Sequence, residues 1–74
     1  MGGESTQPGE AEARAALDDL KLGMSGDAAS KLQVALGLAQ GDLKEAIEHA
    51  LTDVNAGKID EARATLEKAL ARGH

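Results

Sequence analysis

Residues 41–70, GDLKEAIEHALTDVNAGKIDEARATLEKAL, contain the clearest helical pattern in the chain. Apolar residues recur every three or four positions on both sides of the turn signal Asn55–Gly57, and this is the spacing of one face of an α-helix. The first set is Leu43, Ala46, Ile47, Ala50, Leu51 and Val54, and the second set is Ile59, Ala62, Leu66, Ala69 and Leu70. The stretch therefore predicts two antiparallel helices joined by a short glycine turn.

The first half of the chain has the same organisation. Helical spacing extends over about 9–22 and 27–40, and the breaker GMSGD lies between the two segments at residues 23–27. The apolar positions are Ala13, Ala16, Leu17 and Leu20, then Ala28, Leu32, Ala35, Leu36 and Ala39. We predict that Gly23 caps the first helix, that Ser25 or Asp27 caps the second, and that Asp42 caps the third.

These elements define one all-α domain over residues 9–74, with hairpin one at 9–40 and hairpin two at 42–72. Residues 1–8 are rich in Gly, Ser, Thr and Gln, have no apolar periodicity, and are expected to form a disordered leader. Four short antiparallel helices can form either two stacked helix-turn-helix hairpins or a small four-helix bundle. Both architectures remain open at this point.

The two hairpins match at an offset of about 34 residues. The identical pairs are Ala16 and Ala50, Leu17 and Leu51, Asp19 and Asp53, Gly23 and Gly57, Ala28 and Ala62, Leu32 and Leu66, Ala35 and Ala69, and Leu36 and Leu70. A shared helical period explains part of this match, but it does not explain why the turn glycines coincide. The offset predicts an internal repeat.

The segments GDLKEAIEHAL and GKIDEARATLEKAL resemble the second helix of tetratricopeptide repeats, and Gly57, Ala62, Leu66 and Ala69 fit that pattern residue by residue. The large aromatic residues of that family's first helix are absent. The resemblance implies a protein-interaction or scaffold module whose first helices line a concave face. On that face Glu12, Asp19, Glu48, Thr52 and Asp53 would bind a basic peptide or helix, whereas the alternative is that these residues only provide solubility.

The second helical segment has apolar residues on more than one face. Val34 and Leu38 lie outside its main stripe. A helix that is apolar on two faces lies between neighbours or at an interface. Val34 and Leu38 are therefore either covered within the monomer or part of a homodimer interface, and we predict some self-association.

A weaker pattern suggests a metal site. Glu45, His49 and Asp53 are spaced at i, i+4 and i+8, so they lie along one side of a helix. Carboxylate and imidazole groups can hold a divalent metal ion, and a small metal-binding bundle is one alternative function. The other interpretation is a solvated polar face. No other cofactor is predicted.

Composition limits the remaining function classes. The 74 residues include no Cys, Phe, Tyr or Trp, so the core must consist mainly of Ala and Leu and has no disulfide. The net charge of −5 argues against nucleic acid and anionic membranes as partners. MGGEST fits a myristoylation outline through Gly2 and Thr6, although a plain leader is the alternative. With no signal-peptide pattern visible, we expect a cytoplasmic protein.

No catalytic motif stands out. The serines have no nucleophile-elbow pattern, and the glycines match neither a dinucleotide-binding loop nor a phosphate-binding loop. We therefore expect no enzyme. A structural bundle with no ligand, natural or engineered, is the main alternative to an interaction module.

Overall fold

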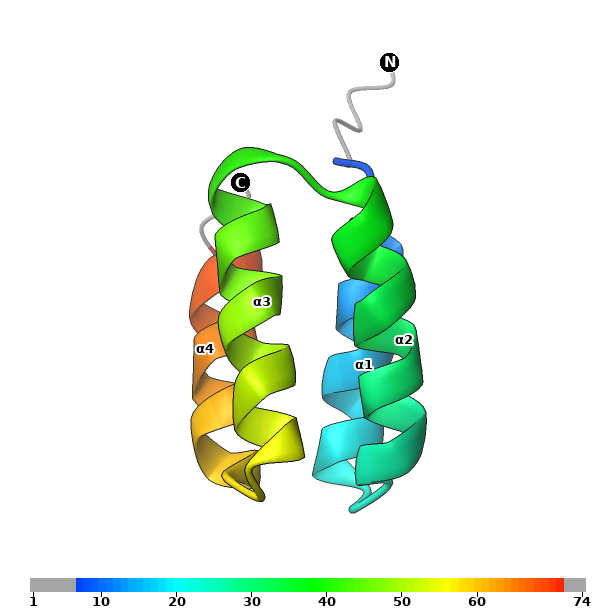
Figure 1. Ribbon diagram of the computed structural model, residues 1–74, viewed down its shortest axis with the longest axis vertical. Helices are drawn as coiled ribbons and strands as arrows, with labels where there is room; N and C mark the ends of the chain where they lie inside the picture. Colours follow the sequence, from blue (N-terminus) through cyan, green and yellow to red (C-terminus); the bar gives the residue numbers. More distant parts are fainter. Residues whose placement is uncertain (1–6, 72–74) are drawn as a thin grey trace.

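The computed structural model describes residues 7–71, and within this range the chain forms four helices and no strand (Figure 1). They are α1 (Glu10–Lys21), α2 (Ser25–Leu38), α3 (Gly41–Asn55) and α4 (Ile59–Ala71). The predicted all-α fold is confirmed. Residues 1–6, which contain the myristoylation outline and most of the predicted leader, and residues 72–74 lie outside the described residues.

The helices form a four-helix bundle in which each helix packs against two others. α1 packs against α2 and α4, and α3 also packs against α2 and α4. Figure 1 shows α2 and α3 side by side, with α1 and α4 behind them, so α1 and α3 lie diagonally across the bundle. A rotation about the long axis of the bundle would carry α1 onto α3 and α2 onto α4. Under this rotation the α1–α2 contact corresponds to the α3–α4 contact, and the α2–α3 contact corresponds to the α4–α1 contact.

The core consists of aliphatic side chains of modest size. The buried members are Ala13, Ala16, Leu17, Leu20, Ala28, Leu32, Ala35, Ala39, Leu43, Ile47, Ala50, Val54, Ala62, Leu66 and Leu70. Leu32, Ile47 and Leu66 are the largest side chains that are fully buried. Burial of such a side chain stabilises the fold by about 1.5–3 kcal/mol, and the small alanines allow the helices to approach closely. The predicted apolar stripes are confirmed, with Leu36, Leu51, Ile59 and Ala69 partly buried at their edges.

The two hairpin turns have the same hydrogen bonds. Gly23 and Gly57 have φ angles of 80° and 81°, in the left-handed region that favours glycine. The N–H of Met24 donates to the carbonyl of Asp19 at 2.8 Å, and the N–H of Lys58 donates to the carbonyl of Asp53 at 2.7 Å. The N–H of Gly23 donates to the carbonyl of Leu20 at 3.1 Å, and the N–H of Gly57 donates to the carbonyl of Val54 at 3.0 Å. Both turns are therefore Schellman motifs, which confirms Gly23 as the cap of the first helix.

The predicted N-terminal caps are wrong. α2 begins at Ser25 and its N-cap is Met24, so neither Ser25 nor Asp27 caps it. α3 begins at Gly41 with Gln40 as its N-cap, so Asp42 lies within the first turn. The Schellman turn explains why Met24 is the N-cap of α2. Met24 completes the turn through its hydrogen bond to Asp19, and the helix begins at the next residue. α2 also ends earlier than predicted, at Leu38, because Ala39 and Gln40 have extended backbones.

α1 begins one residue later than the helical spacing predicts, at Glu10 rather than at residue 9. Pro8 lies in the turn before the helix, and the N-cap is Gly9 with a φ angle of 89°. Within residues 7–71, no helix combines the length and apolar character needed to span a membrane.

Candidate functional site

The most unusual surface lies on hairpin one. Among residues 7–71, the large apolar side chains that are exposed are Leu22, Met24, Val34 and Leu38, at 72%, 43%, 56% and 45% of their full exposure. We call these four residues the hairpin-one surface. The interpretation that Val34 and Leu38 are covered within the monomer is therefore wrong, because neither α1 nor α3 covers these two side chains.

The α2 part of this surface has the spacing of a helix-packing seam. Met24, Asp27, Lys31, Val34 and Leu38 follow one another at intervals of three, four, three and four residues. Lys31 shows which way this stripe faces, because its Nζ lies 2.5 Å from Oδ2 of Asp19 on α1. The stripe therefore runs along the side of α2 that borders α1.

The Asp19–Lys31 ion pair lies within this surface. Asp19 is buried, and Lys31 is partly exposed. The hydrogen bond that Lys31 donates to Asp19 is the main reason why the pKa of Lys31 is raised above its usual 10.5; burial opposes this shift, and the negative charges of Asp19 and Asp27 add to it. The Asp19 carboxylate is thus engaged within the hairpin.

The five residues predicted to bind a basic peptide are divided between two helices. Glu12 and Asp19 lie on α1, whereas Glu48, Thr52 and Asp53 lie on α3. Glu48 and Thr52 are exposed, while Glu12 and Asp53 are partly buried. Because α1 and α3 are diagonal in the bundle, the structure does not bring the two groups together on one concave face.

The residues of the predicted metal site are not gathered into a ligand set. Glu45 and His49 are exposed on α3, and Asp53 is partly buried. In the part of the chain that the structure describes, no three His, Cys, Asp or Glu side chains are placed to hold a metal ion together.

A cleft of about 450 Å³ lies where the ends of three helices meet. Its lining residues are Gln7, Glu10, Gln40, Gly41, Asp42, Leu43, Ala46, Thr65, Lys68, Ala69 and Leu70. This lining contains no His, Cys or Ser, so it offers no nucleophile paired with a histidine base. The sequence pattern did not predict the cleft, because its residues come from separate helix ends.

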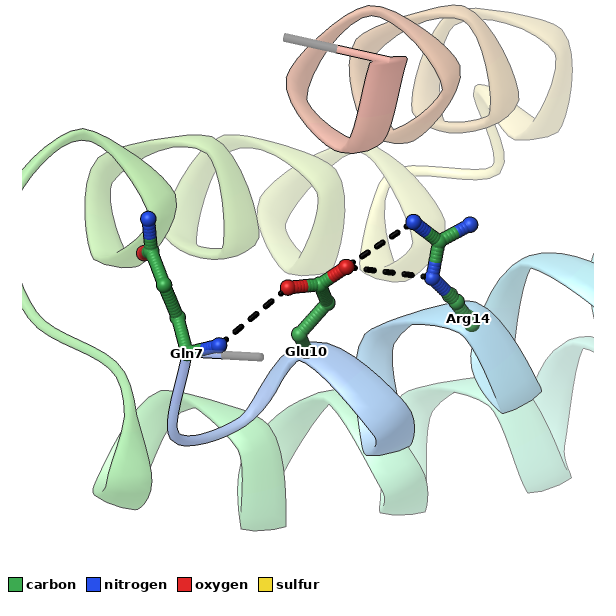
Figure 2. Close-up of polar contacts among 3 residues, drawn as sticks. All are labelled: Gln7, Glu10 and Arg14. Carbon is green, nitrogen blue, oxygen red and sulfur yellow. Dashed lines mark hydrogen bonds and ion pairs between the residues drawn. The ribbon is translucent and has the colours of Figure 1, made fainter. Parts of the chain in front are cut away.

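Glu10 at the rim of this cleft is part of the local structure of α1 (Figure 2). Its Oε1 accepts a hydrogen bond from the backbone N–H of Gln7 at 3.3 Å, and its Oε2 accepts from Nε and Nη2 of Arg14 at 3.2 and 2.8 Å. A carboxylate in the first helical turn also interacts favourably with the helix dipole. Glu10 therefore stabilises the start of α1, which is a sufficient explanation for its position.

Comparisons of the chain with protein-family models, with curated proteins and with solved structures found no match. The resemblance of the helix openings to tetratricopeptide repeats therefore stays a prediction. The hairpin-one surface is the feature that ordinary folding requirements explain least.

Proposed function

We propose that the chain is a protein-interaction module that docks through the hairpin-one surface. The observation that supports this proposal is a difference between the two hairpins. At the offset of 34 residues, Leu22, Met24, Val34 and Leu38 correspond to Ala56, Lys58, Lys68 and Arg72. Hairpin two thus has small or basic residues where hairpin one has large apolar ones.

The helices that carry these residues are otherwise alike. The exposed positions 26, 27, 30, 33, 34 and 37 of α2 each correspond to an exposed position of α4. Four of these six α4 positions have charged residues, namely Asp60, Glu61, Glu67 and Lys68, whereas among the six α2 positions only Asp27 is charged. Hairpin two shows that this scaffold does not need apolar residues on its outer side. Val34 and Leu38 are four residues apart on α2 and are therefore neighbours on its surface, and exposed apolar side chains that lie together commonly mark interaction sites.

The chemistry of the surface favours an apolar partner. No charged residue occurs from Leu32 to Gly41, and Asp19 is already paired with Lys31. A helix with an apolar face can pack against α2 by the usual interdigitation of side-chain ridges and grooves. A strongly basic peptide would find little opposite charge on this half of α2.

Site-specific photocrosslinking tests the proposal. A benzophenone amino acid is placed at Gln33, which directly precedes Val34 on the exposed side of α2, or at the corresponding exposed residue of α4, Glu67. Each purified variant is irradiated alone and in an extract of cells that express the chain. We expect covalent adducts from Gln33 and few from Glu67.

The main alternative is a structural bundle with no ligand. In that case neither position forms specific adducts, alone or in the extract. Equal adduct formation from Gln33 and Glu67 would also contradict the proposal, because it would reflect nonspecific contact.

A further inference from the structure

We infer that the partner of the hairpin-one surface is a second copy of this chain, with α2 antiparallel to α2 of the partner and a two-fold axis near Val34. This inference rests on the proposed function and specifies it. A two-fold interface brings the same patch of both copies together, so that patch must be complementary to itself. The charge, shape and area of the surface can each be compared with this requirement.

The distribution of charge favours pairing through α2. The chain has a net charge of −5, so most parts of its surface would repel a second copy. The segment Leu32–Gly41 has no charged residue and can meet its own copy without such repulsion. Antiparallel packing centred on Val34 sets residues 32–36 of the two copies, which include no charged residue, against each other. Gly37 then lies opposite the partner's Lys31, whose charge is already paired with Asp19. Asp27, seven residues before Val34, then lies opposite the end of the partner's α2.

The two glycines within α2 leave room for a second helix to approach. Gly26 and Gly37 lie within α2 and are exposed, and a Cβ atom added to either would meet no atom within 4 Å. A helical glycine in open space destabilises a monomer by about 0.5–1 kcal/mol relative to alanine. The monomer gains no packing in return, whereas a neighbouring helix could approach closely over Gly37, three residues from Val34.

The area of the hairpin-one surface limits the strength of the dimer. α2 has 14 residues and is about 21 Å long. Together with the adjoining side of α1 it offers a face roughly 20 Å square, given a helix diameter of about 10 Å. This is smaller than the ~800 Å² per partner of a standard stable interface, so we expect a weak and transient dimer.

Sedimentation velocity on the full chain, at concentrations from about 10 µM to 1 mM, measures this equilibrium. Val34→Lys introduces the residue that hairpin two has at the corresponding position, Lys68. Ala64→Lys adds the same charge at an exposed position of α4 and serves as the matched control. We expect Val34→Lys to weaken association about tenfold or more, and Ala64→Lys to leave it nearly unchanged. Circular dichroism verifies that both variants remain helical.

Engineered cysteines test the orientation, because the natural chain has none. A disulfide needs Cα atoms within about 7 Å, so Val34→Cys should form a dimer in a glutathione buffer only if the two copies of Val34 meet. Ala64→Cys is the control and should stay largely monomeric.

A strict monomer at the highest concentration, or equal disulfide formation by both cysteine variants, would overturn the inference. These results are distinguishable from failure of the proposed function. If the chain is monomeric but the probe at Gln33 still forms adducts with other proteins in the extract, the surface binds a different partner. If Gln33 forms no adducts at all, both proposals fail.

Discussion

At the scale of single residues, Gly9 combines a left-handed backbone with close packing against α2. Its φ angle is 89°, and a Cβ atom there would lie 2.8 Å from the carbonyl oxygen of Ala35 and 3.2 Å from Cβ of Ala39. We expect Gly9→Ala to reduce the free energy of unfolding by about 2–3 kcal/mol, from backbone strain and from displacement of α1 away from α2. Urea denaturation followed by circular dichroism measures the loss.

Gly57→Ala is the matched control for Gly9→Ala. Gly57 has a similar φ angle of 81°, but an added Cβ would meet no atom within 4 Å. This variant should lose only the backbone contribution of about 1–2 kcal/mol. Equal losses in the two variants would show that the contact between Gly9 and α2 has no energetic role.

The Asp19–Lys31 pair predicts a specific dependence of stability on pH. The pKa of Lys31 is raised above 10.5 in the folded chain, mainly because Lys31 donates a hydrogen bond to Asp19. The stabilisation that the Asp19–Lys31 pair provides is therefore fully present below the ordinary lysine pKa of 10.5. It is lost as the pH rises through the higher pKa of Lys31 in the folded chain. The wild type should be more stable than Lys31→Gln from neutral pH to about pH 9, and the difference should shrink by about pH 11.

Urea midpoints of both proteins across this pH range provide the measurement. Lys44→Gln, which removes an exposed lysine from α3, controls for the general effect of losing a positive charge. If the difference between wild type and Lys31→Gln is the same at neutral and high pH, the ion pair does not stabilise the hairpin.

At the scale of helices and turns, Gly37 links monomer stability to the proposed interface. It lies inside α2 with open space around it, so Gly37→Ala should raise the free energy of unfolding by about 0.5–1 kcal/mol. The added methyl group would also hold a second α2 away, so the same variant should associate more weakly. Urea denaturation at low concentration and sedimentation at high concentration separate the two effects. A variant that is more stable and also associates more strongly would contradict the proposed close approach at Gly37.

The elements also show which parts of the structure the sequence could predict. The apolar stripes and Gly23 were sufficient for the helices and the first hairpin turn, because helical period and left-handed glycine are local properties. The caps at Ser25 or Asp27 and at Asp42 were predicted wrongly. The chain enters α2 through Met24 and α3 through Gln40, and neither is a residue type that typically caps a helix N-terminus.

Contacts between distant segments were less predictable. Val34 and Leu38 were recognised as a second apolar face, but only the packing of α1 and α3 shows that they are exposed. The cleft beside Glu10 was not predicted, since it forms where separate helix ends meet. The ion pair between Asp19 and Lys31 was missed for the same reason, because it joins two helices across a turn.

At the scale of the whole molecule, the two hairpins are arranged as if by rotation about the bundle axis. The pairs α1–α2 and α3–α4 correspond to each other, and so do α2–α3 and α4–α1. This arrangement surrounds one shared core with four helices and directs the outer faces of α2 and α4 to different sides. A difference in surface residues therefore gives the outer face of α2 fewer charged residues than the outer face of α4, while both helices bury the same kinds of side chain in the core.

The rotation makes a prediction about the core itself. Leu32 and Leu66 correspond at the offset of 34 residues, and both are fully buried. Truncation of a buried leucine to alanine typically lowers the free energy of unfolding by 2–5 kcal/mol, so Leu32→Ala and Leu66→Ala should each cause a loss in about this range, equal within about 1 kcal/mol. A chain of this size is marginally stable, so either variant should be partly unfolded at moderate temperature. Leu38→Ala removes an exposed leucine from the same helix as Leu32 and should change stability by less than about 0.5 kcal/mol at concentrations where the chain is monomeric. Urea denaturation of the three variants under the same conditions tests the prediction. A loss confined to Leu32 or to Leu66 would show that one hairpin, rather than the shared core, determines the stability of the bundle.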